Sequence, residues 1–110
     1  MMILVALLCS FLFAGHAHAL DLPTLNPGIN DLAAMFPPAS YTDLEQRLRR
    51  FKTETASSIV VLTVKSLEGE SIDSVSRKAF AALPLNESDL RKTVLLVVAR
   101  KEREVSFQAG

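Results

Sequence analysis

The chain has 110 residues, 49% of them hydrophobic and 22% charged, with twelve Lys or Arg residues against twelve Asp or Glu. This balance gives no sign of a surface for nucleic acid or anionic lipid, so we expect no nucleic-acid partner. The length suits one small domain with a single core.

The first nineteen residues have the pattern of a cleaved signal peptide. An apolar run extends from Ile3 to Ala14, and Ala17-His18-Ala19 is a cleavage site of the A-x-A type. The alternative is a membrane anchor, but the run is shorter than the ~20 residues that a spanning helix needs. We therefore predict residues 1–19 as a signal peptide cut before Leu20, and an exported protein of the periplasm or cell envelope.

Cleavage would also remove Cys9, His16 and His18, which are all the cysteine and histidine that the chain has. The mature chain would then hold no thiol or imidazole. This excludes Cys or His nucleophiles, disulfides and zinc sites of the usual Cys/His type.

The amino-terminal part of the mature chain predicts a proline-containing lead-in over residues 20–38, with a short turn or helix at 29–36. An amphipathic helix should follow, capped by Ser40 or Thr42. Its apolar stripe consists of Tyr41, Leu44, Leu48 and Phe51.

A βαβ unit should come next. Residues 59–64 and 94–99 are apolar, β-branched runs typical of strands buried on both faces. Between them, Ser71 can cap a helix over 72–83 that Pro84 ends, and 85–92 forms a polar connection. The two strands should be parallel with a right-handed crossover.

Residues 104–108 alternate like an antiparallel strand at the edge of the sheet. The predicted fold is therefore α/β, a mixed sheet with a βαβ unit, an antiparallel edge hairpin and helices packed on the sheet as an α/β/α sandwich. The chain stops at Gly110, directly after this strand, and nothing obvious remains to cover the other face of the sheet.

Acidic residues are the main candidates for a site, since no phosphate-binding, Rossmann, nucleophile-elbow or zincin motif is present. The loop 65–71 should lie at the carboxyl end of a parallel strand, where open α/β sheets bind ligands. We group seven oxygen-bearing residues at this edge, and oxygen ligands suit calcium or magnesium. Caps and helix-dipole partners are the alternative role for these acids. The seven are Asp31, Glu68, Glu70, Asp73, Asn86, Glu87 and Asp89, of which Asp31, Glu68, Glu70 and Asp89 are the candidate metal ligands.

Four segments in this order resemble the TPM domain family. Ile29 to Phe36 is similar to its V-N-D-x-A-G-x-L opening; the amphipathic helix and the 59–73 segment follow, and then residues 94–110 resemble its G-V-L-L-L-V-A…R-x-V-R-I-x-x-G pattern. The resemblance places the domain at 29–110. It implies a secreted or membrane-anchored domain with a sheet sandwiched by helices. It also implies roles such as photosystem II repair, assistance to membrane proteins, acid phosphatase activity or divalent-cation binding.

Three departures from the family pattern bear on these roles. Arg91 stands where the family has its second acidic residue, which weakens a cation or phosphatase interpretation. Leu83-Pro84-Leu85 replaces a Trp-Gly pair. Family domains also continue beyond the glycine that matches Gly110, so we expect this chain to be the front portion of such a domain.

The leading hypothesis is a non-enzymatic module that binds or assists a membrane protein complex or another envelope protein. The alternative is a metal-dependent acid phosphatase using Asp31 with Glu68, Glu70 or Asp89. A truncated product without independent function is a third hypothesis. We assign no catalytic or cofactor-binding residue, and the sequence leaves the oligomeric state open.

Overall fold

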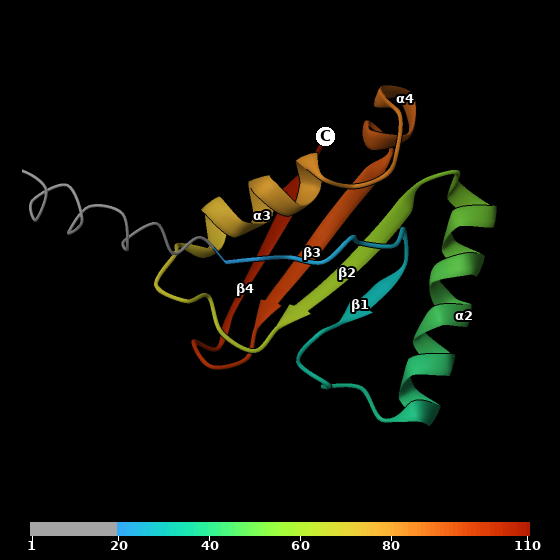
Figure 1. Cartoon of the computed structure of the whole chain (residues 1–110). Helices are drawn as coiled ribbons and strands as arrows, with labels where there is room; N and C mark the ends of the chain where they lie inside the picture. Colours follow the sequence, from blue (N-terminus) through green and yellow to red (C-terminus); the bar gives the residue numbers. More distant parts are fainter. Residues whose placement is uncertain (1–19) are drawn as a thin grey trace, which may run out of the picture.

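The computed structural model describes residues 20–110, so the expected signal peptide lies outside the described residues. These residues form a four-stranded mixed sheet in the order β1-β2-β3-β4 with helices packed against it (Figure 1). The strands are β1 (Ile29–Asp31), β2 (Ser58–Val64), β3 (Thr93–Ala99) and β4 (Glu104–Ala109), and the helices are α2 (Pro38–Thr55), α3 (Ile72–Ala81) and α4 (Glu87–Leu90).

The βαβ unit is as the sequence predicts. β2 and β3 are adjacent and parallel, with Ser58 opposite Thr93 and Val64 opposite Ala99, and α3 connects them. β4 pairs antiparallel with β3. Ser71 caps α3 as expected, because its side chain accepts a hydrogen bond of 3.1 Å from the Ser74 amide.

The lead-in differs from the prediction, because it contributes a strand rather than a turn or helix. Ile29 to Asp31 pairs in parallel with Val61 to Thr63 at the edge of the sheet. The buried Asn30 amide nitrogen donates to the carbonyl of Val61 at 3.2 Å. A three-residue segment is too short to show strand periodicity, and pairing with β2 decides its conformation.

Helix α2 begins earlier than its predicted caps. Pro37 is the N-cap and Pro38 starts the helix, so Ser40 and Thr42 lie inside it. A proline at this position costs nothing, since the first amides of a helix have no partner within it. Thr42 donates instead to the Pro38 carbonyl at 3.1 Å.

The hydrophobic core lies between the sheet and α3. β2 and β3 contribute alternate side chains from paired positions, and α3 contributes Val75 and Ala79. Leu25 of the lead-in belongs to the same core, although it is far from α3 in sequence. The strand residues in this core are Val60, Leu62, Val64, Leu95, Val97 and Ala99.

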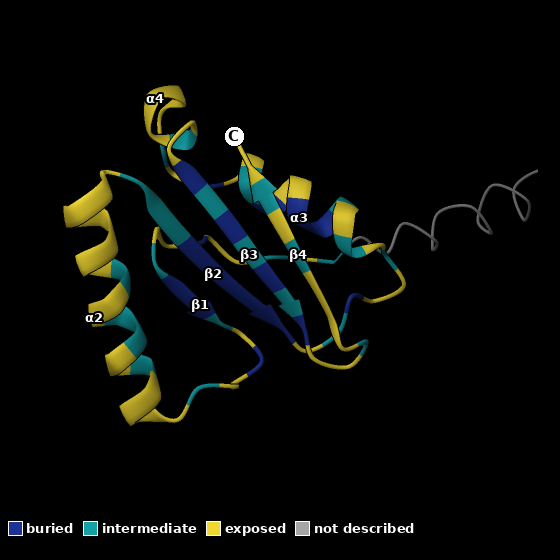
Figure 2. Cartoon of the chain, turned by 180° about the vertical axis from the view of Figure 1, so that it is seen from behind, coloured by how far each residue is buried: buried dark blue, intermediate teal, exposed yellow. Residues whose placement is uncertain are grey.

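The opposite face of the sheet is less covered. Figure 2 views this face, and within residues 20–110 only α2 lies on it, beside β1 and β2. β2 is buried from Val60 to Val64, as predicted, whereas β3 alternates between buried and half-buried residues. The prediction of burial on both faces is therefore wrong for β3, because no described element covers its second face.

The predicted polar connection 85–92 contains the short helix α4, capped by Asn86, whose side chain accepts from the Asp89 amide at 2.8 Å.

No helix within residues 20–110 is long and apolar enough to cross a membrane.

Candidate functional site

Asp31 ends β1 and organises the turn that follows it. Its Oδ1 accepts hydrogen bonds from the Thr63 hydroxyl at 2.6 Å and the Met35 amide at 2.9 Å, and its Oδ2 accepts from the Phe36 amide at 2.9 Å. The Thr63 hydroxyl in turn accepts from the Ala33 amide at 3.0 Å. Asp31 and Thr63 together therefore hold the turn against β2.

These hydrogen bonds keep Asp31 ionised. Burial raises the pKa of Asp31. The hydrogen bonds from the Thr63 hydroxyl and the amides of Met35 and Phe36 together lower it by more, so the pKa lies below the ordinary 3.8. Ala34, where the family pattern has glycine, takes a left-handed conformation with φ of 51°. The Asp31 carboxylate offsets the steric cost of this conformation, because it accepts hydrogen bonds from two amides of the same turn.

The loop after β2 is held by two further carboxylates, Glu70 and Glu102. Glu70 accepts from the Leu20 amide at 2.7 Å and forms an ion pair with Lys78. Glu102, in the turn between β3 and β4, accepts from the Leu67 amide at 3.0 Å and the Ser66 hydroxyl at 3.3 Å. The pKa of each is lowered below its ordinary 4.5, chiefly by Lys78 for Glu70 and by the Leu67 amide for Glu102.

Sequence reasoning missed Thr63 and Glu102. Thr63 is the one polar residue in the apolar run 59–64, which is a signal that its hydroxyl has a buried partner. Glu102 is the single acid within the basic turn 100–103. Its role depends on the spatial meeting of two loops, which the sequence does not give.

A hollow of about 220 Å³ lies at this edge of the sheet. It is lined by apolar residues of the lead-in and β2, together with polar residues of the loop after β2. Glu68 stands beside it, and with φ of 51° it forms a left-handed turn together with Gly69. The lining residues are Leu20, Leu22, Leu32, Val64, Lys65, Ser66 and Glu68.

Asp89 does not lie with the other candidate ligands. Asp31 and Glu68 lie at the carboxyl ends of the parallel strands β1 and β2. Asp89, in contrast, belongs to α4, which precedes the amino end of β3, and its carbonyl accepts a hydrogen bond from the Thr93 hydroxyl at 2.7 Å. A seven-residue strand spans about 20 Å, so the grouping at one edge is wrong for α4 and its cap. Asn86, Glu87 and Asp89 lie at the opposite edge.

Arg91 lies at that opposite edge too. Its Nη2 is 3.7 Å from Glu87 Oε2, and its side chain is 74% exposed. Its charge is thus separated from Asp31 by the length of β3 and does not repel a cation there.

The four candidate ligands are not gathered at one place among the described residues. Asp31 already accepts three hydrogen bonds, Glu70 is paired with Lys78, and Asp89 is at the other edge. Among residues 20–110, no three acidic, histidine or cysteine residues are grouped so that they could hold a metal ion.

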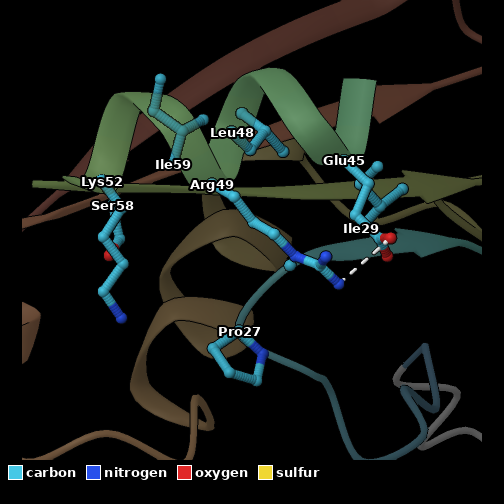
Figure 3. Close-up of a pocket in the computed structure, with 9 residues that line it drawn as sticks. Pro27, Ile29, Glu45, Leu48, Arg49, Lys52, Ser58 and Ile59 are labelled. Carbon is cyan, nitrogen blue, oxygen red and sulfur yellow. Dashed lines mark hydrogen bonds and ion pairs between the residues drawn. The ribbon is translucent and has the colours of Figure 1, made fainter. Parts of the chain in front are cut away.

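A second hollow, of about 180 Å³, lies between α2 and the β1–β2 edge (Figure 3). Arg49 reaches toward Glu45 across it, with 3.3 Å between Nη2 and Oε1. Leu48 and Ile59 supply its apolar wall. The site predicted from the sequence lies elsewhere, because none of the candidate ligands lines this hollow.

The most exposed apolar surface lies on the β3–β4 hairpin. Val105 is 58% exposed and Phe107 is 69% exposed. They pair with Val98 and Leu96, which are half-buried and lie on the same face, opposite α3. We call these four residues the hairpin face.

The match to known families agrees with this geometry. Residues 29–110, from β1 through the whole sheet, match the TPM domain. The chain belongs to the TPM domain family. No curated protein gave a significant match.

The TPM domain match covers the segments from which the resemblance was drawn, including the turn at Asp31 and the glycine at 110. A Cβ atom added at Gly110 would overlap the Leu90 carbonyl. A side chain at this position would require the backbone at the end of α4 to shift.

Proposed function

We propose that this TPM domain is a non-enzymatic module of the cell envelope, exported by its signal peptide, that binds or assists a membrane protein complex. The hairpin face is the observation that carries the proposal. A monomeric protein seldom leaves large apolar side chains together on one surface without a binding role.

The composition of β3 supports the same proposal. The run Val94 to Ala99 is uninterrupted by polar residues, which is typical of a strand covered on both faces. Strands with one face in water usually alternate apolar and polar residues instead. Half-burial of Val98 and Leu96 therefore favours a cover on this face, supplied by a further segment of the domain or by a partner, and we propose a partner.

The partner's chemistry follows from the surface. Leu96, Val98, Val105 and Phe107 present aliphatic and aromatic groups without charge, so the partner should offer an apolar surface of its own. Phe107 is the natural anchor, since exposed aromatic residues bury the largest area at interfaces.

Photo-crosslinking tests the proposal directly. A photoreactive amino acid replaces Phe107 in the full-length chain, which is expressed with export in its native cells. A second variant carries the same group at Phe51, a 37% exposed phenylalanine on α2, as a matched control. We expect a membrane-protein adduct from position 107 and none from position 51.

The other outcomes count against the proposal. An adduct with a second copy of the chain would assign the hairpin face to self-association. Equal labelling from both positions, or none from either, would remove the evidence for a specific partner.

The alternative, a divalent-metal-dependent acid phosphatase using Asp31, makes a different prediction. Under the non-enzymatic proposal, in contrast, the full-length chain should hydrolyse phosphate esters in calcium or magnesium no faster than buffer, and the separation of Asp89 from Asp31 and Glu68 supports this expectation. A metal-dependent rate that disappears in Asp31→Asn would support the phosphatase instead.

A further inference from the structure

Glu70 accepts a hydrogen bond from the first residue after the predicted cleavage site. The Leu20 nitrogen lies 2.7 Å from Glu70 Oε2, although fifty positions separate the two residues. Leu20 and Leu22 pack against the core, and Leu25 is only 2% exposed. The segment that leads from Leu20 to β1 is therefore held along the α3 side of the sheet (Figure 1).

The surroundings of Glu70 suit a positive charge. Its side chain is only 16% exposed, and its Oε1 pairs with Lys78 and accepts from the Ser74 hydroxyl at 3.5 Å. Oε2 faces the Leu20 nitrogen. Other charged groups near this corner include Asp21, which follows Leu20 in the chain, and Lys65 and Glu68, which line the adjacent hollow with Leu20.

Cleavage changes the chemistry of that nitrogen. Hydrolysis breaks the bond between the Ala19 carbonyl carbon and the Leu20 nitrogen. The hydroxyl of water goes to Ala19, which leaves as a carboxylate, and the protons go to the nitrogen, which becomes an ammonium group. The nitrogen gains two N–H donors and a positive charge without needing to move.

We infer that Glu70 is the binding site for the new amino-terminal ammonium group, so that processing before Leu20 locks the lead-in onto the domain. The inference rests on the export proposed above. The uncleaved chain gives the Glu70 carboxylate one amide N–H, whereas the ammonium group adds a positive charge and turns this hydrogen bond into an ion pair. Cleavage one or two residues away would place the charge elsewhere and lose the pairing.

The cleavage position also matters for packing. Leu20 and Leu22 contact the core, and the Glu70 bond fixes the start of the segment that carries them. The ammonium group therefore anchors Leu25 indirectly, five positions along the chain, and β1 beyond it.

The test uses the exported protein. The full-length chain is expressed in a bacterium, recovered from the envelope, and its amino terminus is identified by sequencing and intact mass. The pH dependence of amino-terminal acetylation then gives the pKa of the Leu20 amino group. Its ordinary range is about 7.7–8.0, and pairing with Glu70 should raise it, so that acetylation at pH 7 is roughly threefold or more slower than in an unpaired terminus.

Glu70→Gln should restore ordinary acetylation, because the amide accepts a hydrogen bond but carries no charge. Glu54→Gln, a matched change at an exposed position at the end of α2, should leave the slow rate unchanged. If Glu70→Gln fails to fold, the pKa of the unaltered protein still decides the matter.

The outcomes separate the two proposals. Recovery of a chain that still begins at Met1, or one cut elsewhere, contradicts both the predicted processing and the inference. A Leu20 terminus with an ordinary pKa leaves export intact and overturns the ammonium site alone.

Discussion

The two faces of the sheet are built from the same strands but are covered to different extents. On one face, α3 has only ten residues, yet it buries Val75, Ser76 and Ala79 and helps enclose the core. On the other face, α2 has eighteen residues and none of them is buried. Helix length therefore says little about how much a helix contributes to packing.

The difference follows from what each helix can reach. α3 is connected directly to β2 and lies over β3 and β4, with the lead-in beside it. α2 lies at the β1–β2 edge and leaves the hairpin face uncovered among the described residues (Figure 2). Stability should therefore depend mainly on the α3 face.

The largest expected effect comes from neighbouring leucines of β3. Leu95 is fully buried toward α3, whereas Leu96 is half-buried on the hairpin face. Leu95→Ala should lower the free energy of unfolding by about 2–5 kcal/mol, through lost transfer energy and the cavity left behind. Leu96→Ala should cost about 1 kcal/mol or less, since a half-buried side chain loses fewer contacts.

Urea unfolding of the two variants measures this difference. Equal losses would mean that the hairpin face is packed in solution, and the comparison between the faces would fail. A larger loss for Leu96→Ala would point to a covering segment or a second copy on that face.

The second largest effect concerns Thr63, which links the turn at Asp31 to β2. Thr63→Val keeps the shape but removes the hydroxyl that donates to Asp31 and accepts from the buried Ala33 amide. Leaving that amide without a partner should cost about 1–3 kcal/mol. Thr63→Ser is the control, because it retains the hydroxyl and should cost less.

The pH dependence of this effect has a definite sign. The pKa of Asp31 is lowered in the folded state. The ionised Asp31 therefore contributes fully to the free energy of unfolding above its ordinary pKa of 3.8, and this contribution is lost as the pH falls through the lower pKa of the folded state. The stability gap between the unaltered chain and Thr63→Val should therefore narrow in acid. A gap that stays constant down to full protonation would show that the Thr63–Asp31 bond adds no stability.

Much of the architecture could be predicted from the sequence, because strong periodic patterns determine it. The runs 59–64 and 94–99, with a capped helix between them, gave the correct strands, pairing and order. β1 could not be predicted, because three residues carry too little pattern and only pairing with β2 makes them a strand. The second face of β3 was predicted wrongly, because composition shows what a strand can bury and not what covers it.

The candidate site was predicted less well than the fold. Asp31 was a candidate metal ligand in the sequence, and that role stays a prediction; its hydrogen-bond partners on β2 and in its own turn came only from the structure. Asp89 was misplaced although the order of the elements predicts its position, because it precedes β3 and the amino end of β3 lies away from the carboxyl end of the parallel β2. Glu70 was correctly placed near the start of α3, but its contact with Leu20 depends on the path of the lead-in.

The smallest expected effect sharpens the comparison between α2 and α3 at their carboxyl ends. Ala56 caps α2 in a left-handed conformation with φ of 60°, whereas Ala82 caps α3 in a right-handed one with φ of −88°. Both residues are exposed, so a change to glycine removes little packing. Glycine adopts the left-handed conformation without the steric cost that a Cβ imposes. Ala56→Gly should therefore raise the free energy of unfolding by about 0.5–1 kcal/mol. Ala82→Gly should leave it unchanged or lower it slightly, because glycine there only makes the unfolded chain more flexible.

Thermal and urea unfolding of both variants measure the difference. A loss of stability in Ala56→Gly would mean that the end of α2 is not held in the left-handed conformation in solution, and that the exposed face is looser than the α3 face even in its backbone.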